Sequence, residues 1–397
     1  MAQKPLTVLW ISDYPLEWMP DPPLELRLSP KRHPATWMMV LLAELEKNPD
    51  LRLHVVAMRH RIDKSFSFER NGVTFHVLKA QPWTRLATLF YRDTLLISRL
   101  CRKINPDLVH AWGMEKAAGA IACRLGYSYV MTVQGLYGWY KEKIPLGAYY
   151  TFIERLERVY LPRAPVVTTE SNFAVKFLKE RYPDLCVVQA EHAPNRAFSQ
   201  IIRTPETNPF HFITVGGLGH RKGTDLLFNA LNVLIPELSF KLTILTNPAP
   251  EYISSLRSSL PENFWKRVEF KYQLLPHEVA RELSSPTMLL LPTRVDTSPN
   301  AVKEAVVAGV PVIASDIGGI PDYVFPQKNG LLAAPGNLAD FCEAIRRACS
   351  HPLFSKGKVD PEILSRTRDY LSPERMAKNF LGAYEAALAK SRTGHGN

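Results

Sequence analysis

Short apolar runs alternate with amphipathic stretches along almost the whole chain. In the first half, continuous apolar runs such as Leu6–Ile11 are typical of strands buried on both faces. Apolar residues that recur every three or four positions predict helices between these runs. The predicted strands are Leu6–Ile11, Leu51–Arg59, Gly72–Leu78, Asp107–His110, Tyr129–Val133 and Pro165–Thr169, and the predicted helices are Thr36–Lys47, Arg85–Lys103, Glu115–Leu125, Pro145–Tyr160 and Asn172–Arg181.

The same alternation resumes after a break at Pro194–Pro209, where prolines lie among polar residues. Strands that alternate with helices form parallel sheets covered on both faces. We therefore predict two doubly wound α/β domains, residues 1–200 and 201–372, whose strand ends face a cleft, and a helical segment at 373–397. The predicted strands are Phe210–Val215, Lys241–Thr246, Val268–Phe270, Met288–Pro292, Pro311–Ala314 and Gly330–Ala333, and the predicted helices are Thr224–Leu234, His277–Leu283, Pro299–Ala308, Leu338–Cys349 and Pro373–Leu388.

The chain is basic, and its charge is uneven. The formal net charge is +11, and residues 1–200 account for +8 of it, with 27 Lys and Arg against 19 Asp and Glu. A basic half is compatible with nucleic acid, an anionic membrane surface, acidic substrates, or an enzyme with no special partner. Because no nucleic-acid-binding module is recognisable, a nucleic-acid partner is not expected.

The cysteines and the apolar runs indicate the compartment. Five scattered cysteines without a CxxC pair are not typical of a disulfide framework, so a reducing compartment is expected. No apolar run reaches the ~18 residues that a membrane span needs. No signal peptide is apparent at the N-terminus, where Asp13 follows a short strand. We therefore predict a cytoplasmic location, with any membrane contact peripheral and on the inner face.

The segment Asp296–Glu304 follows a predicted strand and opens a helix. Ser298 is predicted to cap this helix and Pro299 to be its first residue. The first N–H groups of a helix lack helical partners and suit a phosphate. Glu304 would lie over the Asn300 turn and accept hydrogen bonds from a ribose diol, while Asp296 reaches a sugar hydroxyl. A helix with an acidic cap and one surface glutamate is the alternative. The N–H groups concerned are those of Asn300, Ala301 and Val302.

The segment Gly216–Gly223 also follows a predicted strand. It lacks the third glycine of a dinucleotide-binding fingerprint and the Gly-Lys-Ser/Thr of a P-loop. The loop brings Arg221 and Lys222 to a helix start, where two cations can neutralise a diphosphate. A tight turn with solvated charges is the alternative.

Taken together, these segments resemble the retaining nucleotide-sugar glycosyltransferases of the GT-B fold, glycosyltransferase family 4. The resemblance is most specific over residues 210–335. It extends more weakly to Pro106–His110 and to the final helix, which in this fold crosses back to the first domain. The residues that carry it are the glycine turn ending in Lys222-Gly223, the acids Asp296 and Glu304, the Gly309-x-Pro311-Val segment, and Ser315-Asp-x-Gly318-Gly319-Ile-Pro321-Asp322.

The resemblance implies a role for each matching position. Lys222 and Arg221 would hold the donor diphosphate, with Gly216 and Gly217 beside it. Glu304 would bind the ribose and Asp296 the transferred sugar. The N–H groups of Asn300, Ala301 and Val302 would hold the distal phosphate, and Phe270–Leu274, including Tyr272, would line the base pocket.

The resemblance also implies the chemistry. The co-substrate would be a UDP- or GDP-sugar, and the acceptor a saccharide or a lipid-linked molecule. The leaving diphosphate would deprotonate the acceptor on the same face of the sugar, which retains the anomeric configuration. Neither a metal nor another cofactor is expected, and the chain contains no Asp-x-Asp pattern.

Three positions depart from the family pattern. Gly217 stands where the family often has Arg, and Asp296 stands where Glu is usual. Gln134 stands where the family commonly has a His that faces the sugar, and Gln cannot exchange protons. An epimerase or hydrolase of sugar nucleotides, and a catalytically weak sugar-nucleotide-binding protein, are therefore kept as alternatives.

Acceptor recognition is less well defined by the sequence. His110 and Trp112, at a strand end, either face the cleft as acceptor residues or belong to the core. The aromatic segment Tyr137–Tyr160 is either an acceptor lip that touches lipid or a buried helix. The Leu and Phe stripe of Arg85–Lys103 is predicted to face the core.

Overall fold

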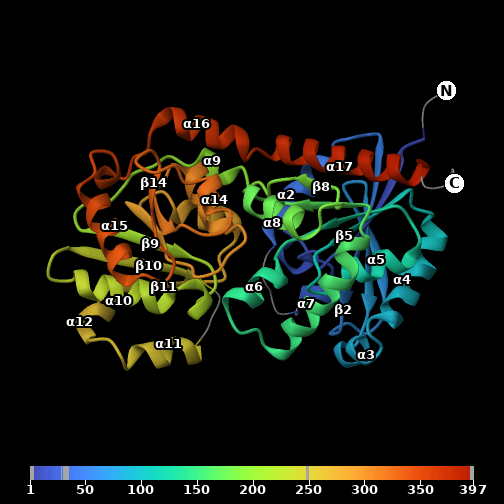
Figure 1. The fold of residues 1–397 in the computed structure, drawn as a ribbon, viewed down its shortest axis with the longest axis horizontal. Helices are drawn as coiled ribbons and strands as arrows, with labels where there is room; N and C mark the ends of the chain where they lie inside the picture. The colour runs from blue at the N-terminus through green and yellow to red at the C-terminus, as the bar shows by residue number, and fades with distance from the viewer. Residues whose placement is uncertain (1–3, 28, 30–34, 247–249, 394–397) are drawn as a thin grey trace. The chain divides into compact units, whose positions relative to one another are not determined.

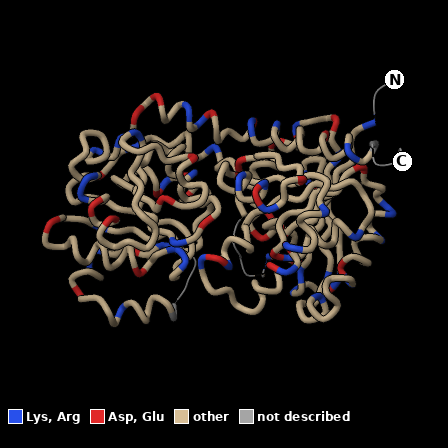
Figure 2. The backbone as a smooth tube through the Cα atoms, in the orientation of Figure 1, with Lys and Arg blue, Asp and Glu red and all other residues tan. Residues whose placement is uncertain are grey.

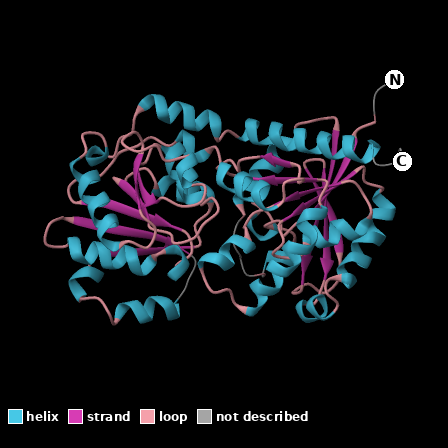
Figure 3. Cartoon of the chain, viewed as in Figure 1, coloured by secondary structure: helices cyan, strands magenta, loops and turns pink. Residues whose placement is uncertain are grey.

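The computed structural model describes residues 4–27, 29, 35–246 and 250–393. The chain forms two compact units (Figure 1). One combines the chain up to Glu191 with the segment from Met376 onward, and the other runs from His192 to Arg375. Each unit has a sheet of parallel strands, apart from one antiparallel edge strand in the first unit, with helices on its faces (Figure 3), so the predicted pair of doubly wound α/β folds is confirmed. The domain boundaries at residues 200 and 372 and the cleft stay predictions.

The first unit has an eight-stranded sheet in the order β3-β4-β2-β1-β5-β6-β7-β8. Its neighbouring strands are parallel except β3 and β4, which pair antiparallel. That hairpin was not predicted, although Asn71-Gly72 is a strong signal for a two-residue turn and both residues have positive φ. The strands are β1 (Leu6–Ile11), β2 (Leu51–Arg59), β3 (Phe66–Arg70), β4 (Val73–Lys79), β5 (Leu108–Trp112), β6 (Tyr129–Thr132), β7 (Val166–Thr169) and β8 (Val187–Gln189).

One of the predicted helices of this unit is divided in the structure, and another is preceded by a helix that was not predicted. The single helix predicted at Arg85–Lys103 is two helices, because Leu89 and Phe90 adopt left-handed backbone conformations between them. A short helix also precedes the one predicted at Pro145–Tyr160. The helices include α2 (Thr36–Leu45), α3 (Pro82–Ala87), α4 (Tyr91–Ile104), α5 (Ala118–Leu125), α6 (Tyr137–Lys143), α7 (Ala148–Tyr160) and α8 (Asn172–Arg181).

The last helix, α17 (Pro373–Thr393), packs on the first unit from Met376 onward. The Tyr384 hydroxyl accepts a hydrogen bond from Trp10 Nε1 at 3.0 Å and lies 2.8 Å from His110 Nδ1. Ser128 Oγ donates to the Ala387 carbonyl at 2.9 Å. These contacts join the end of the chain to its first strand and to β5.

The second unit has a six-stranded sheet in the order β11-β10-β9-β12-β13-β14, and all neighbours are parallel. The strands are β9 (Phe210–Val215), β10 (Phe240–Thr246), β11 (Val268–Tyr272), β12 (Met288–Leu291), β13 (Val312–Ser315) and β14 (Gly330–Ala333). The helices are α9 (Ala197–Gln200), α10 (Thr224–Leu234), α11 (Pro250–Arg257), α12 (Glu262–Trp265), α13 (Pro276–Glu282), α14 (Asn300–Ala308), α15 (Leu338–Ser350) and α16 (Pro361–Tyr370).

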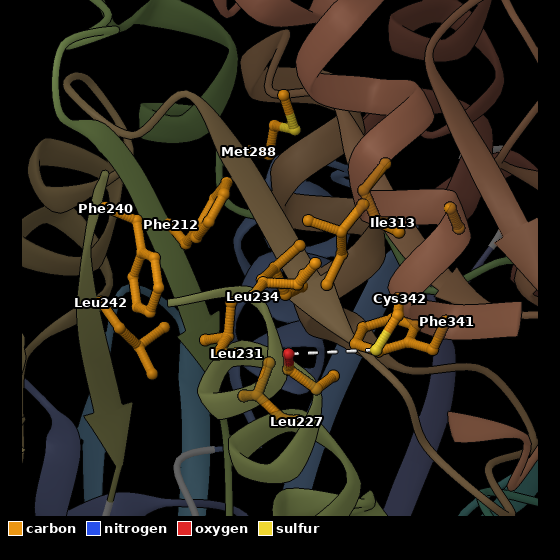
Figure 4. Close-up of a cluster of buried hydrophobic side chains, with 14 of the residues drawn as sticks. Phe212, Leu227, Leu231, Leu234, Phe240, Leu242, Met288, Ile313, Phe341 and Cys342 are labelled. Carbon is orange, nitrogen blue, oxygen red and sulfur yellow. Dashed lines mark hydrogen bonds between the residues drawn. The ribbon is translucent and has the colours of Figure 1, made fainter. Parts of the chain in front are cut away.

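Alternate residues of these strands enter two different cores, as the pleat of a sheet requires. Phe212 and Met288 pack with Leu227 of α10 and Phe341 of α15 on one face (Figure 4). On the other face, residues such as Ile213 pack against α14. Both faces are therefore covered by helices, and the strand ends are the part of the sheet that is left for loops and ligands.

Among the described residues, no helix combines the length and the apolar character that crossing a membrane would require. Lys and Arg residues are distributed over both units (Figure 2).

Candidate functional site

In the second unit, the two sequence motifs follow neighbouring strands. β9 and β12 are far apart along the chain but pair directly, with Ile213 opposite Leu289. Such a point, where the strand order reverses, is where doubly wound sheets bind ligands at the carboxyl ends of their strands. The Gly216–Gly223 loop leaves β9 at this point, and the Asp296–Glu304 segment comes after β12.

The two loops are packed tightly against each other. A Cβ on Gly223 would lie 1.9 Å from the Pro292 carbonyl oxygen, and Gly223 has a φ of +70°. The Arg294 N–H donates to the Arg221 carbonyl at 2.9 Å. Another residue at position 223 would therefore push the cationic loop away from the β12 loop.

The charged residues of the two motifs pair with one another. Lys222 Nζ donates to Asp296 Oδ2, and Arg221 Nη1 lies 3.6 Å from the same oxygen. Arg221 Nη1 also donates to the Val295 carbonyl at 3.0 Å. A diphosphate bound to Lys222 would thus share this ammonium group with Asp296.

The start of α14 differs from the prediction in three details. The helix begins at Asn300 with Pro299 as its N-cap residue, and no side chain caps it. Ser298 instead forms a 3.0 Å hydrogen bond with the buried Tyr323 hydroxyl. The Val302 N–H donates to the Pro299 carbonyl at 3.1 Å, so the prediction that it lacks a partner is wrong. Among the hydrogen bonds of the described residues, none uses the N–H of Asn300 or Ala301.

Glu304 lies on the first turns of α14, and its side chain is 9% exposed. Burial raises the pKa of its carboxyl to about 8, although Lys303 beside it acts in the opposite direction. Among the described residues, the carboxyl group has no hydrogen-bond partner. A buried carboxyl without a hydrogen-bond partner can accept hydrogen bonds from ligand hydroxyls once it ionises.

The remaining predicted residues of this unit lie at or near the same edge of the sheet. The Gly216 N–H donates to the Leu245 carbonyl at 2.9 Å. A Cβ on Gly217 would have no atom within 4 Å, which leaves open space above the loop. Tyr272, at the end of β11, is half exposed and stacks near Phe270. Their roles toward a ligand stay predictions.

In the first unit, Gln134 lies beyond the end of β6, beside the end of β5. Gln134 Oε1 and Glu115 Oε2 both lie within 3.0 Å of the place where a Cβ on Gly113 would be. Among the described residues, neither Gln134 Nε2 nor Glu115 Oε2 has a hydrogen-bond partner, although both are buried. Turning the Gln134 amide by half a rotation would therefore offer its NH₂ group to Glu115.

Glu115 is a residue that the sequence analysis missed. Burial raises the pKa of its carboxyl, and a hydrogen bond from the Tyr137 hydroxyl acts against that rise. Nearby, Glu157 accepts the N–H groups of Tyr137 and Gly138 at 3.0 and 2.9 Å and so holds the start of α6. The available signal was positional, because Glu115 follows β5 as Gln134 follows β6, and these strands are neighbours.

His110 and Trp112 belong to the core, so of the two alternatives given for them the acceptor role is not supported. The His110 side chain is 0% exposed, with its ring nitrogens 2.8 Å from the Tyr384 hydroxyl and 2.6 Å from Thr132 Oγ1. Trp112 is 3% exposed and packs against Trp10. An imidazole with both nitrogens hydrogen-bonded in the core has no nitrogen to offer an acceptor.

A cavity of about 180 Å³ lies at the carboxyl ends of four strands of the first unit. It combines charged and apolar side chains. Its lining residues are Asp13, Met58, His60, Ala80, Pro82, Arg85, Leu86, Phe90, Lys116 and Tyr149.

Two family models match the chain. Residues 209–351 match the model described as glycosyl transferases group 1, and residues 35–189 match the model described as glycosyltransferase family 4. The two matched segments together make up well over half of the chain and fall in different units.

Curated relatives and solved structures agree with these matches. The D-inositol 3-phosphate glycosyltransferase of Nocardioides sp. is 27% identical over 43% of this chain and 40% of its own length. The GDP-mannose-dependent alpha-mannosyltransferase of Mycobacterium tuberculosis is 23% identical over 81% of this chain and 84% of its own length. The chain thus spans less than half of the first of these relatives.

The sucrose-phosphate synthase from Thermosynechococcus elongatus has the same fold. Its structure matches with a TM-score of 0.81, at 17% identity, over 97% of this chain and 100% of its own length.

Proposed function

This chain belongs to the family 4, group 1 glycosyltransferases of the GT-B fold, and from that membership we propose that it transfers a sugar from a nucleoside-diphosphate sugar to an acceptor hydroxyl. One juxtaposition in the second unit carries the proposal. The cationic Arg221-Lys222 loop and the buried Glu304 carboxyl lie beyond neighbouring strand ends, where such sheets bind phosphate-bearing ligands.

The donor is a UDP- or GDP-sugar. Lys222 and Arg221 hold its diphosphate, together with the N–H groups of Asn300 and Ala301. Glu304 accepts the ribose hydroxyls, and Asp296 contacts the transferred sugar. Support for a guanine base comes from the relative named for its dependence on GDP-mannose. Tyr272 provides an aromatic face for the base of either donor.

The transfer retains the anomeric configuration. The anomeric carbon loses its bond to the diphosphate oxygen and gains a bond to the acceptor oxygen on the same face. The acceptor proton passes to the departing diphosphate. The chain contributes positive charge to the leaving group and orients the sugar, which are the effects that dominate in such transfers. Gln134 takes part by hydrogen bonding and not by proton exchange.

The transfer proceeds without a metal ion. Arg221, Lys222 and the free N–H groups at the start of α14 supply the positive charge that a cation would otherwise supply. The acceptor is a saccharide or a lipid-linked molecule bound by the first unit, and the cavity at its strand ends is the candidate place.

The test is a transfer assay with UDP-sugars and GDP-sugars, each supplied with and without a panel of saccharide and lipid-linked acceptors. Released nucleoside diphosphate and the mass of the product are measured, with and without EDTA. We expect acceptor-dependent release, a product heavier by one sugar, and turnover that survives EDTA. Free monosaccharide or an epimer formed without acceptor would identify a hydrolase or an epimerase. Donor binding without turnover would identify a binding protein, and rescue of EDTA-treated protein by Mg²⁺ or Mn²⁺ would refute metal independence.

A further inference from the structure

α3 and the beginning of α4 expose large apolar side chains, so the prediction that the stripe of Arg85–Lys103 faces the core holds for Phe90 but not for its leucines at 86, 89 and 95. The exposed fractions are 72% for Trp83, 62% for Leu95, 56% for Tyr91, 50% for Leu89 and 41% for Leu86. Of the 13 large hydrophobic side chains exposed among the described residues, these five lie within one short stretch of chain. Isolated exposed apolar residues are ordinary, but a group of them marks an interaction surface. We call these five residues the α3–α4 surface.

Contacts with Arg124 of α5 and with the buried Asp93 hold the α3–α4 surface in place. The Arg124 guanidinium of α5 lies 4.1 Å from the centre of the Tyr91 ring, and its Nη1 donates to the Leu89 carbonyl at 2.8 Å. Arg85 Nε donates at 2.6 Å to Asp93, which is 1% exposed. The apolar side chains are therefore presented by an ordered turn between two helices.

The exposed charges that α4 contributes beside the α3–α4 surface are all positive. Arg92, Arg99, Arg102 and Lys103 are exposed on α4, at three- and four-residue spacings that place them on the face of Leu95. The one acidic residue between positions 80 and 106 is Asp93, which is buried in its pair with Arg85. Exposed aromatic and leucine side chains beside unopposed cations are typical of a helix face that lies on a membrane.

We propose that the α3–α4 surface docks on an anionic lipid bilayer. An anionic bilayer suits both the apolar side chains of this surface and the cations beside it. Trp and Tyr side chains lie at the headgroup level, and Arg and Lys pair with lipid phosphates. A second copy of the chain fits less well, since a two-fold contact through this surface would set like charges against each other. The centre of an interface with another protein is usually depleted of charge, whereas Arg92 and Arg99 lie on the same helix face as Leu95.

The cavity of the first unit adjoins the α3–α4 surface. Leu86 contributes to both, and Pro82 and Phe90 of the same segment also line the cavity. A bilayer that contacts Trp83 and Leu86 would therefore bring headgroups to the cavity, whose charged lining residues are Arg85, Lys116 and Asp13. Docking itself does not depend on the proposed sugar transfer, so failure of one leaves the other standing.

The experiment measures partition of the full chain onto sedimenting vesicles. Phosphatidylcholine vesicles are compared with vesicles in which about a quarter of the lipid is phosphatidylglycerol. We expect binding to the anionic vesicles alone, and a loss of binding when salt is raised from about 0.1 M to about 1 M. A thermal melt of each variant confirms that it is folded.

Two double variants separate the apolar and the cationic contributions. Trp83→Ser with Leu95→Ser, and Arg99→Glu with Lys103→Glu, should each weaken partition at least about 10-fold. Ile202→Ser is the apolar control, since Ile202 is 84% exposed in the second unit. Lys176→Glu with Lys179→Glu is the charge control, because these exposed lysines lie on α8 and the change in net charge is the same.

The proposal is overturned by any of three results. The first is absence of binding to anionic vesicles. The second is equal loss in the surface variants and their controls, which would mean that net charge or general stickiness causes binding. The third is self-association in light scattering that Trp83→Ser with Leu95→Ser abolishes without vesicle binding, which would assign the surface to a second copy.

Discussion

The pairing of Lys222 with Asp296 connects two segments that lie 74 positions apart in the sequence. In the absence of a ligand, the carboxylate partly neutralises the ammonium group. A donor diphosphate carries more negative charge than one carboxylate and would draw Lys222 toward itself. The same residue can therefore hold the loop in place before binding and the leaving group during transfer.

Lys222→Ala should weaken nucleoside-diphosphate binding about 10- to 150-fold, because a charge-assisted hydrogen bond contributes about 1.5–3 kcal/mol. Titration calorimetry with UDP and GDP measures the loss. Lys241→Ala is the matched control, since Lys241 also pairs with a carboxylate, that of Glu206 at 2.5 Å, but lies near the start of β10, away from the carboxyl ends of the strands. Equal affinities for Lys222→Ala and the parent chain would show that the glycine loop is not part of the phosphate site.

Glu304 should make stability and binding depend on pH. Its folded pKa of about 8 is above the ordinary value of 4.5. The neutral carboxyl therefore favours the folded state below about pH 4.5, and this contribution is lost as the pH rises through 8. Denaturant titrations across this range should show a decline in stability that Glu304→Gln flattens. Parallel curves for the two proteins would contradict the raised pKa.

Ligand binding provides a second test of the protonation state of Glu304. Ribose hydroxyls donate to the ionised carboxylate, so binding of a nucleoside diphosphate near pH 7 should release a proton. Calorimetry in two buffers of different ionisation enthalpy detects this release, and Glu304→Gln should abolish it. If proton release persists in the variant, the titrating group lies elsewhere.

Gln134 and Glu115 are half-buried residues, each with a buried polar atom that could hydrogen-bond to the other. Gln134→Ala should lower the transfer rate about 10- to 100-fold, the scale of a lost neutral hydrogen bond with some misplacement of the donor. Donor affinity should change little, because the diphosphate contacts lie in the other unit. Gly113→Ala should produce a similar loss, since its Cβ would displace Glu115. A parent rate in Gln134→Ala would place this residue outside the reaction.

At the scale of elements, the glycine loop depends on its contact with the loop after β12. Gly223→Ala should lower the free energy of unfolding by about 2–4 kcal/mol, because it combines a left-handed backbone with a clash against Pro292. Gly217→Ala is the control in the same loop, where a Cβ meets no atom within 4 Å. Urea unfolding compares the two. Equal stabilities would mean that the loop can move away from Pro292 at no cost.

The break between α3 and α4 decides which apolar side chains of this segment are exposed. A continuous helix would carry the whole apolar stripe of Arg85–Lys103 on one side. The left-handed residues Leu89 and Phe90 divide the stripe, so that Ile97 and Phe90 face the core and Leu95 faces outward. The α3–α4 surface is thus created by a turn that contains no proline or glycine, so the sequence does not indicate it.

At the scale of the whole molecule, the chain leaves the first unit after Glu191 and returns to it at Met376. The return is secured by the Tyr384 hydroxyl, which links α17 with Trp10 and His110. Because all three side chains are buried, removal of the hydroxyl leaves polar atoms without their partner.

Tyr384→Phe should destabilise the first unit by about 1–3 kcal/mol. Nucleoside-diphosphate affinity should stay at the parent value at temperatures where the chain is folded, because the second unit is untouched. Tyr91→Phe is the control, since Tyr91 is largely exposed. Thermal unfolding and calorimetry measure the two quantities, and an unchanged melting temperature would show that the hydroxyl contributes nothing to the docking of α17.

Periodicity alone determined the two doubly wound units, because apolar runs and helical repeats are local properties of the chain. β9, α10 and α8 begin and end where the pattern predicts. The donor-site motifs were likewise found locally, since a glycine loop or a helix start carries its own backbone chemistry.

Tertiary structure decided what those residues touch. His110 looks like a strand-end histidine in the sequence, but α17, more than 250 residues later, covers it. Serine is a common helix cap, but the Ser298 hydroxyl is hydrogen-bonded to Tyr323 and does not cap α14. Glu115 lies beside Gln134 only because β5 pairs with β6, and Lys222 pairs with Asp296 only because β9 pairs with β12. Strand order depends on packing between distant segments, so no local pattern could reveal these pairs.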